Sequence, residues 1–180
     1  MHAEAKTLRI ADRGTVLTLA YADVLAAHGG ESWFGVATGF RMLQAAGAAL
    51  SRERLWDREG LSVHSGHPGR GVRDAVEYVT HCVSRGRYRV DAGKETGCRR
   101  GMRFAWEVEA ESAKARLELR EGFVPEELFV LLDRRGTSAE RADDRDRFAA
   151  LKRGLAERIW QEPLTALFHV GLLETEAAHA

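Results

Sequence analysis

Apolar residues recur with helical spacing near the start of the chain. In residues 15–28, TVLTLAYADVLAAH, they fall on one helical face that includes Leu17 and Leu25, and the run ends at the pair Gly29-Gly30. Glycine readily adopts the left-handed conformation that closes a helix. The pattern therefore predicts a helix over residues 15–28 that ends in the turn HGG.

A second helix is predicted over residues 33–50, WFGVATGFRMLQAAGAAL, which contains three interior glycines. Gly35, Gly39 and Gly47 are separated by four and eight residues, so that they fall near one face. Each costs about 1 kcal/mol of helix stability relative to alanine. We therefore expect another backbone or a ligand to approach this face closely.

The segment LSVHSG, residues 61–66, alternates briefly and predicts a strand, after which HPGRG predicts a turn. Valines then follow at positions 72, 76, 79 and 83. This spacing is the apolar stripe of an amphipathic helix. It predicts a helix that starts near Gly71 and ends before Gly86.

The second half of the chain predicts both strands and helices. RYRVD, residues 87–91, is typical of a solvated edge strand, although three arginines lie in or beside it. Residues 102–110 and 113–120 alternate with period two and predict an antiparallel hairpin. Helices are predicted from Pro125 to about residue 135 and from Phe148 to Ile159, and the apolar tail is expected to dock until about Glu174.

These elements predict an α+β fold in which a small antiparallel sheet packs against several helices. A length of 180 residues suits one domain, with a core from about residue 15 to about residue 174. No internal repeat or low-complexity tract interrupts it.

Composition narrows the functional classes. The 27 basic residues cancel the 27 acidic ones, so the net charge indicates neither a nucleic acid nor a membrane as partner. No apolar run approaches the roughly 20 residues that span a bilayer, and the N-terminus lacks the apolar core of a signal peptide. We therefore expect a cytoplasmic protein, in which Cys82 and Cys98 are free thiols.

Histidines and one cysteine form the first candidate site. Imidazole and thiolate are the natural ligands of zinc and of similar divalent metals, and the residue types present would allow a site made of His28, His64, His67 and Cys82. Their spacing matches no closed zinc motif. The alternative interpretation is that these side chains are surface groups or hydrogen-bonded core groups.

Helical geometry separates the polar residues of the predicted 71–85 helix. At about 100° per residue, Asp74 and His81 fall within about 20° of each other and opposite the valines, whereas Cys82 lies beside the valines. Either Asp74 and His81 face solvent, or a second layer or a partner protomer covers them and forms a polar pocket. Only in the second case would the carboxylate orient or charge the histidine.

The turn HPGRGVRD is a candidate anion site. Its glycines precede a helix N-terminus, whose N–H groups and dipole favour anions, and Arg70 and Arg73 add positive charge. It matches neither a P-loop nor a dinucleotide-binding fingerprint, so a plain strand-to-helix turn is the alternative. Sequence motifs of serine hydrolases, zinc proteases and kinases are absent.

Three segments resemble the formylmethanofuran dehydrogenase E-subunit-like family. Its motifs are H-G-H-x-C-P-G leading into G-[YF]-R, then Cys-x-x-Asp-Ala, then G-C-T-x-G-K before a strand and a D-x-G-K turn. His28-Gly29 with Gly39-Phe40-Arg41 resembles the first, Asp74-Ala75 the second, and HCVSRG, residues 81–86, the third. The resemblance extends from about residue 17 to about residue 120 and implies an α+β fold.

The departures from that family bear on function. Gly30 stands at the family's second histidine, ESWFG lacks its cysteine and proline, and Gly71 stands at the cysteine before Asp74. The zinc-ribbon cysteines of some members are also absent. A metal site carried over by resemblance keeps His28 and Cys82, with His64 or His67 as substitutes.

The leading hypothesis is a pocket for a metal, such as zinc, or for a small anionic ligand. In it His28, His67 and Cys82 are ligands and Asp74 is an orienting group or base, while Arg41, Arg73 and Arg85 contact the anion. The resemblance adds an accessory role in a redox or one-carbon enzyme system, without making the chain a dehydrogenase.

Two alternatives remain open. One is a non-catalytic homodimer in which the polar face of the 71–85 helix meets a partner. The other is an enzyme that acts on a small anionic substrate with Asp74 or His81 as base.

Overall fold

The first described elements form a two-stranded antiparallel hairpin. The computed structural model describes residues 6–31, 33–52, 54–91, 97–111 and 113–174. Strand β1 (Thr7–Asp12) pairs with β2 (Thr15–Ala20) through a two-residue turn, in which Arg13 and Gly14 have φ angles of 50° and 78°. Positive φ at both positions suits the right-handed twist of a hairpin.

The prediction of a helix over residues 15–28 is therefore wrong for its first six residues. The apolar positions Val16, Leu17 and Leu19 belong to β2, and helix α1 comprises only Tyr21–His28. Leu8 and Ile10 of β1 are buried, so the core extends further toward the N-terminus than residue 15. The predicted closing turn is confirmed, because Gly29 is left-handed at φ 61° and its N–H bonds the Leu25 carbonyl.

Helix α2 (Trp33–Leu50) forms the centre of the molecule, and α3 (Arg70–Thr80) packs along it. The two backbones approach at the glycines of α2. A Cβ on Gly39 would lie 3.1 Å from the Val72 Cα, and a Cβ on Gly35 would lie 3.3 Å from the Gly71 Cα. The expected close approach at these glycines is confirmed, and its occupant is α3. Gly47 faces the Trp56 ring instead.

Helix α3 is shorter than its valine spacing predicts. It ends at Thr80, and His81 adopts a left-handed conformation with φ 57°. The stripe of Val72, Val76 and Val79 is fully buried, as expected. Cys82 lies beyond the helix, where it is buried and donates its S–H to the Leu61 carbonyl at 3.3 Å. The predicted common face of Asp74 and His81 is therefore absent.

A buried arginine closes this end of α3. Arg58, in the short 3₁₀ turn Arg58–Gly60, donates to the carbonyls of Val79 and Tyr78 at 2.7 and 3.0 Å. It also pairs with Asp12 of β1 at 3.1 Å. The guanidinium thus satisfies carbonyls that have no partner within the helix and joins the hairpin to α3.

The second sheet has five strands in the order β4-β3-β5-β6-β7. Its strands are β3 (Ser62–Ser65), β4 (Tyr88–Val90), β5 (Ala105–Glu109), β6 (Ala113–Leu119) and β7 (Phe168–Glu174). Only β3 and β4 pair in parallel, and the predicted hairpin of β5 and β6 is confirmed. The predicted edge strand is β4.

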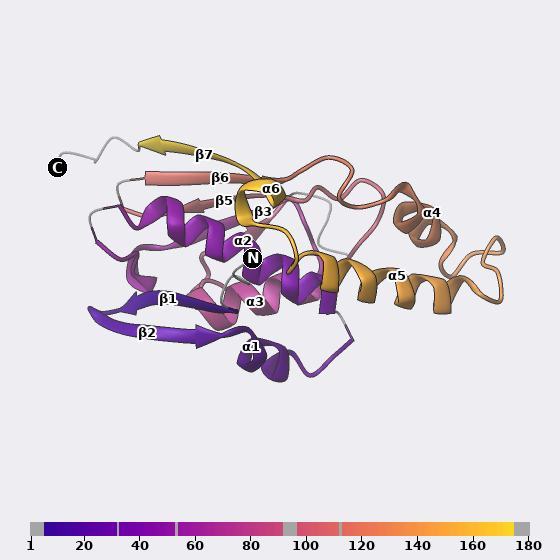
Figure 1. Ribbon diagram of the computed structural model, residues 1–180, viewed down its shortest axis with the longest axis horizontal. Coiled ribbons are helices and arrows are strands. Elements are labelled where there is room, and N and C mark those ends of the chain that lie inside the picture. The colour runs from indigo at the N-terminus through magenta and orange to yellow at the C-terminus, as the bar shows by residue number, and fades with distance from the viewer. Residues whose placement is uncertain (1–5, 32, 53, 92–96, 112, 175–180) are drawn as a thin grey trace.

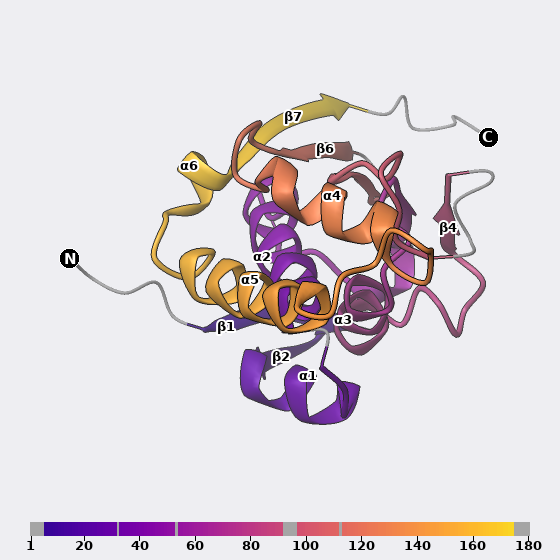
Figure 2. The same ribbon diagram turned by 90° about the vertical axis from the view of Figure 1, so that its right-hand side faces the viewer.

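The inner face of the sheet packs against α2, and the remaining helices complete the layers (Figure 1). Helix α4 (Glu126–Arg134) and helix α5 (Asp144–Arg158) lie side by side near one end of the sheet (Figure 2). The short helix α6 (Leu164–Leu167) leads into β7. The fold is a single α+β domain, as predicted. None of the described helices is both long and apolar enough to span a bilayer.

Candidate functional site

A buried histidine and a carboxylate meet where α1 ends and α3 begins. Nδ1 of His28 lies 2.7 Å from Oδ2 of Asp74. The His28 side chain is 1% exposed, and that of Asp74 is 24% exposed. His28 is the last residue of α1, and Asp74 lies in the second turn of α3. Helix α1 thus forms the second layer that covers Asp74.

The other ring nitrogen of His28 has no hydrogen-bond partner among the described residues. Nε2 is buried, and the Gly30 backbone lies over it. A Cβ on Gly30 would lie 3.0 Å from Nε2. A buried polar atom without a partner costs free energy, so this atom requires an explanation.

The Asp74 carboxylate determines which ring nitrogen of His28 carries the lone pair. When Nδ1–H donates to Asp74, Nε2 of the neutral ring carries the lone pair. Histidines that bind metals commonly donate their other N–H to a carboxylate in this way. The same arrangement suits a base that accepts a proton at Nε2.

Two arginines stand beside the carboxylate on the solvent side. Nε of Arg70 donates to Oδ2 of Asp74 at 3.3 Å, and Nη1 of Arg73 lies 3.9 Å from Oδ1. Their side chains are 74% and 54% exposed. The positive charge predicted at the start of this helix is therefore present, next to a carboxylate that partly neutralises it.

His67 lies in the core, apart from this pair. It is packed against Phe104, with 4.6 Å between ring centroids. Gly69 donates its N–H to Nδ1 at 3.0 Å, so the ring proton is on Nε2. Burial lowers the pKa of His67 to about 4, which keeps the ring neutral. Neither nitrogen offers a free lone pair to a metal in this arrangement.

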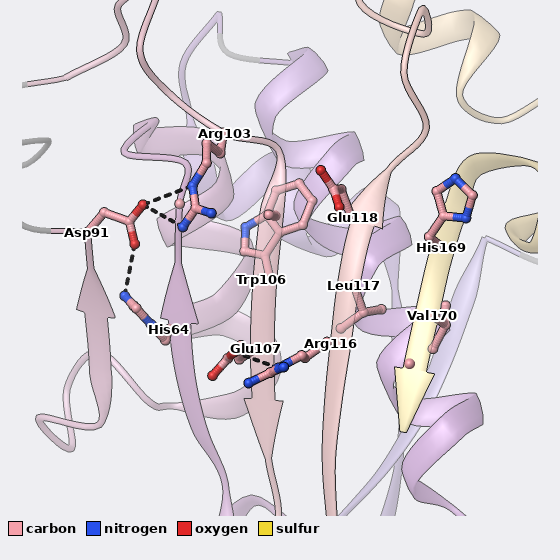
Figure 3. A pocket seen from close by; sticks show the side chains of 13 residues that line it. His64, Asp91, Arg103, Trp106, Glu107, Arg116, Leu117, Glu118, His169 and Val170 are labelled. Carbon is pink, nitrogen blue, oxygen red and sulfur yellow. Dashed lines mark hydrogen bonds and ion pairs between the residues drawn. The ribbon is translucent and has the colours of Figure 1, made fainter. Parts of the chain in front are cut away.

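His64 lies on the outer face of the five-stranded sheet, beside a shallow cavity of about 470 Å³ (Figure 3). Its Nε2 is 3.0 Å from Oδ1 of Asp91, whose other oxygen accepts from Arg103 at 3.0 Å. On the same face, Arg116 pairs with Glu107 at 2.9 Å. With these pairs, the cavity wall is an ordinary solvated sheet face of mixed charge.

The remaining predicted residues are dispersed. His81 lies at the far end of α3. Its pKa is lowered mainly by burial and, to a smaller extent, by the positive charge of Arg58. Arg85 lies near this end too, bonded to the Arg58 carbonyl and 3.3 Å from Glu59. Arg41 is buried in α2 and donates to the Glu162 carbonyl at 2.6 Å.

The four predicted metal ligands do not share one site. Among the residues that the structure describes, no three His, Cys, Asp or Glu side chains lie close enough to hold a metal ion together. Burial raises the pKa of the Cys82 thiol, which opposes the thiolate form that a metal requires. Of the predicted set, the structure joins His28, Asp74 and Arg73.

Sequence reasoning missed two contacts of the candidate groups, although Arg70 itself was part of the predicted anion turn. Arg70 lies four residues before Asp74, a spacing that predicts a helical ion pair. Cys98 lies beside His67, since the Sγ atom and the ring both approach the Cβ position of Gly69. No local pattern links residues 67 and 98, so only the fold reveals that contact.

No family model matches the chain, and a search of curated proteins found no match either. The geometry of the site is therefore the basis for a functional proposal.

Proposed function

We propose that this chain binds a divalent metal ion, such as zinc, through Nε2 of His28, with Asp74 orienting the imidazole. One observation carries the proposal: His28 is buried and bonded to a carboxylate through Nδ1, while Nε2 has no partner among the described residues. This arrangement fits a metal ligand, because a carboxylate on the second nitrogen fixes the tautomer and raises ligand basicity.

Admission of a ligand requires movement of the HGG turn, because Gly30 covers Nε2. Two consecutive glycines suit such movement, since glycine tolerates a wide range of backbone angles. A single protein nitrogen leaves positions on the metal for water or for a small anion. Arg70 and Arg73, close to Asp74, favour an anion as the second component.

The resemblance to the formylmethanofuran dehydrogenase E-subunit-like family supports the same location, since His28-Gly29 and Asp74-Ala75 are among its matching residues. In line with that resemblance, we propose an accessory role in a redox or one-carbon enzyme system. A catalytic role would use Nε2 of His28 as the base, rather than His81, which lies at the other end of α3.

Titration of metal-free protein with Zn²⁺ and Co²⁺, followed by calorimetry and by Co²⁺ absorption, tests the proposal. We expect binding of about one ion per chain, loss of that binding in His28→Ala, and roughly 10–100-fold weaker binding in Asp74→Asn. In Gly30→Ala the added methyl lies against Nε2, so binding should also weaken.

His64→Ala is the matched control, because His64 also pairs with a carboxylate but lies on the exposed sheet face. It should bind the ion as the wild type does. Absence of stoichiometric binding by the wild type, or undiminished binding by His28→Ala, would overturn the proposal.

A further inference from the structure

Within the described residues, no strand pairs with the outer edge of β7, the last strand of the five-stranded sheet. β7 pairs with β6 on one side and is the terminal strand of the sheet (Figures 1 and 2). Its seven residues, FHVGLLE, include no lysine, arginine or proline. The opposite edge, β4, has three residues, of which the central one is Arg89. Short strands and charged side chains are common guards against edge pairing, whereas β7 is seven residues long and has its one carboxylate, Glu174, at its end.

Exposed apolar side chains gather on this same strand. Among the described residues, the large hydrophobic side chains that remain exposed are Val16, Val170 and Leu173, at 51%, 44% and 43%. Two of them lie in β7. Because they are three residues apart, these two side chains point to opposite faces of the sheet, and a strand added at this edge would cover part of both.

The hydrogen-bond pattern shows which backbone groups of β7 point outward. The Arg120 N–H donates to the Leu167 carbonyl at 2.8 Å, and the register then continues with Glu118 opposite His169. Antiparallel strands alternate between bonded and non-bonded pairs. Residues 169, 171 and 173 therefore bond β6, whereas the backbone groups of Val170 and Leu172 point away from the sheet.

We propose that two copies of the chain pair through β7, antiparallel and about a two-fold axis at Gly171, to form one continuous sheet. In this register, Val170 of one copy faces Leu172 of the other. Their outward N–H and C=O groups then meet as bonded pairs, as antiparallel pairing requires. The two side chains lie on the inner face, because they are opposite Leu117 and Ala115 of β6.

This self-complementarity argues for a second copy as the occupant of the edge. An isologous contact requires that each residue i meet residue j while j meets i, and a strand centred on Gly171 satisfies this with apolar residues on both sides. Pairing would extend the apolar layer beside α2 and remove exposed apolar surface. It uses a different surface from the polar face of α3.

The inference does not depend on metal binding. Helices α1 and α3, which carry His28 and Asp74, lie on the other side of α2 from β7 (Figure 1). Failure of one proposal therefore leaves the other standing.

Sedimentation equilibrium of the full chain over a wide concentration range tests the pairing. We expect a monomer–dimer equilibrium in the wild type. Leu172→Lys should raise the dimer Kd by at least about tenfold, because it places a charge in the centre of the interface. Val170→Pro should do the same, because it removes an outward N–H while sparing the bonds to β6.

Val16→Lys is the matched control, since it replaces an equally exposed apolar residue on β2 and should leave the dimer Kd unchanged. Val170→Lys serves as the second variant if the proline variant lacks the wild-type circular dichroism spectrum. Hydrogen exchange should show concentration-dependent protection of the amides of Val170 and Leu172.

Three results would overturn the pairing. One is a wild type that stays monomeric at every concentration, and another is a dimer that none of the β7 variants weakens. The third is a chain ending at Glu174 that dimerises while the full chain does not, which would identify the C-terminal residues as the occupant of the edge.

Discussion

His28 and Asp74 lie 46 positions apart in the chain, yet their side chains meet at 2.7 Å and join α1 to α3. The contact covers the polar side of α3 opposite its valines, and it buries an imidazole that has one nitrogen bonded. Of the two situations considered for Asp74, exposure to solvent or cover by a second layer, the structure has the second.

Replacing the carboxylate by an apolar group should destabilise the fold. Asp74→Ala leaves Nδ1 of His28 buried without its acceptor, and we expect the free energy of unfolding to fall by about 1–3 kcal/mol. Urea denaturation monitored by tryptophan fluorescence measures the change. Glu111→Ala, which removes an exposed ion pair with Arg54, should change the same quantity by less than about 0.5 kcal/mol. Equal effects in both variants would contradict a structural role for the His28 contact.

His67 should make stability depend on pH in a defined window. Its pKa is about 4 in the folded chain because burial disfavours the charged ring, against 6.5 when unperturbed. Between these values the unfolded chain binds a proton that the folded chain does not, so stability falls as the pH drops from 6.5 to 4. The loss approaches about 3 kcal/mol and is absent above pH 6.5.

A variant without a titrating ring isolates this contribution. His67→Asn offers the Gly69 N–H an amide oxygen in place of Nδ1, so the acceptor is retained. Denaturation of both proteins at a series of pH values should show that the wild type loses more stability than the variant across the window. Parallel pH profiles would show that His67 does not carry the effect.

Substitution by alanine should change stability in opposite directions at Gly39 in α2 and at Gly154 in α5. A Cβ on Gly39 would lie 2.9 Å from the Ala75 Cβ and 3.1 Å from the Val72 Cα, so Gly39→Ala must push α2 and α3 apart. We expect a loss of about 1–3 kcal/mol. Gly154 in α5 has nothing within 4 Å of its Cβ position, and Gly154→Ala should stabilise by about 0.5–1 kcal/mol. Thermal denaturation compares them, and a change of the same sign in both would refute the packing argument.

Arg58 should not tolerate lysine. Its guanidinium bonds Val79, Tyr78 and Asp12 at once from a side chain that is 7% exposed. An ammonium cannot reproduce that planar fork, so Arg58→Lys should cost about 2–4 kcal/mol in chemical denaturation. Arg54→Lys, at a side chain that is 80% exposed, should cost less than about 0.5 kcal/mol. A wild-type midpoint for Arg58→Lys would show that the three contacts are replaceable.

Local periodicity predicts much of the fold. The valine stripe of α3, the period-two alternation of β5 and β6, and the long apolar run of α2 each specify one geometry and are confirmed. Residues 15–20 mislead because three apolar positions in six residues suit either a helix or a strand. These residues form a strand because the two-residue turn at Arg13 and Gly14 brings them alongside β1, with which they pair.

The candidate site is less predictable than the fold. The sequence identifies the residue types of His28 and Asp74, but their contact depends on where α1 packs on α3. The predicted placement of His81 on one helix face with Asp74 is wrong because α3 does not continue past Thr80. Arg58 lies in the charged segment SRERLWDREG, residues 51–60, and no local pattern in this segment indicates that one of its arginines will bond the last carbonyls of a distant helix.

Helix α2 begins at residue 33, but the Arg41 guanidinium inside it donates to the carbonyl of Glu162, 121 positions later. During synthesis on a ribosome, this contact can form only after most of the chain has emerged. The packing contacts of α2 are complete only after α5, α6 and β7 have also been synthesised, since all three pack against it. Nascent chains that stop before Glu162 should therefore remain sensitive to protease, and protection of α2 should be acquired late and together with the C-terminal segment.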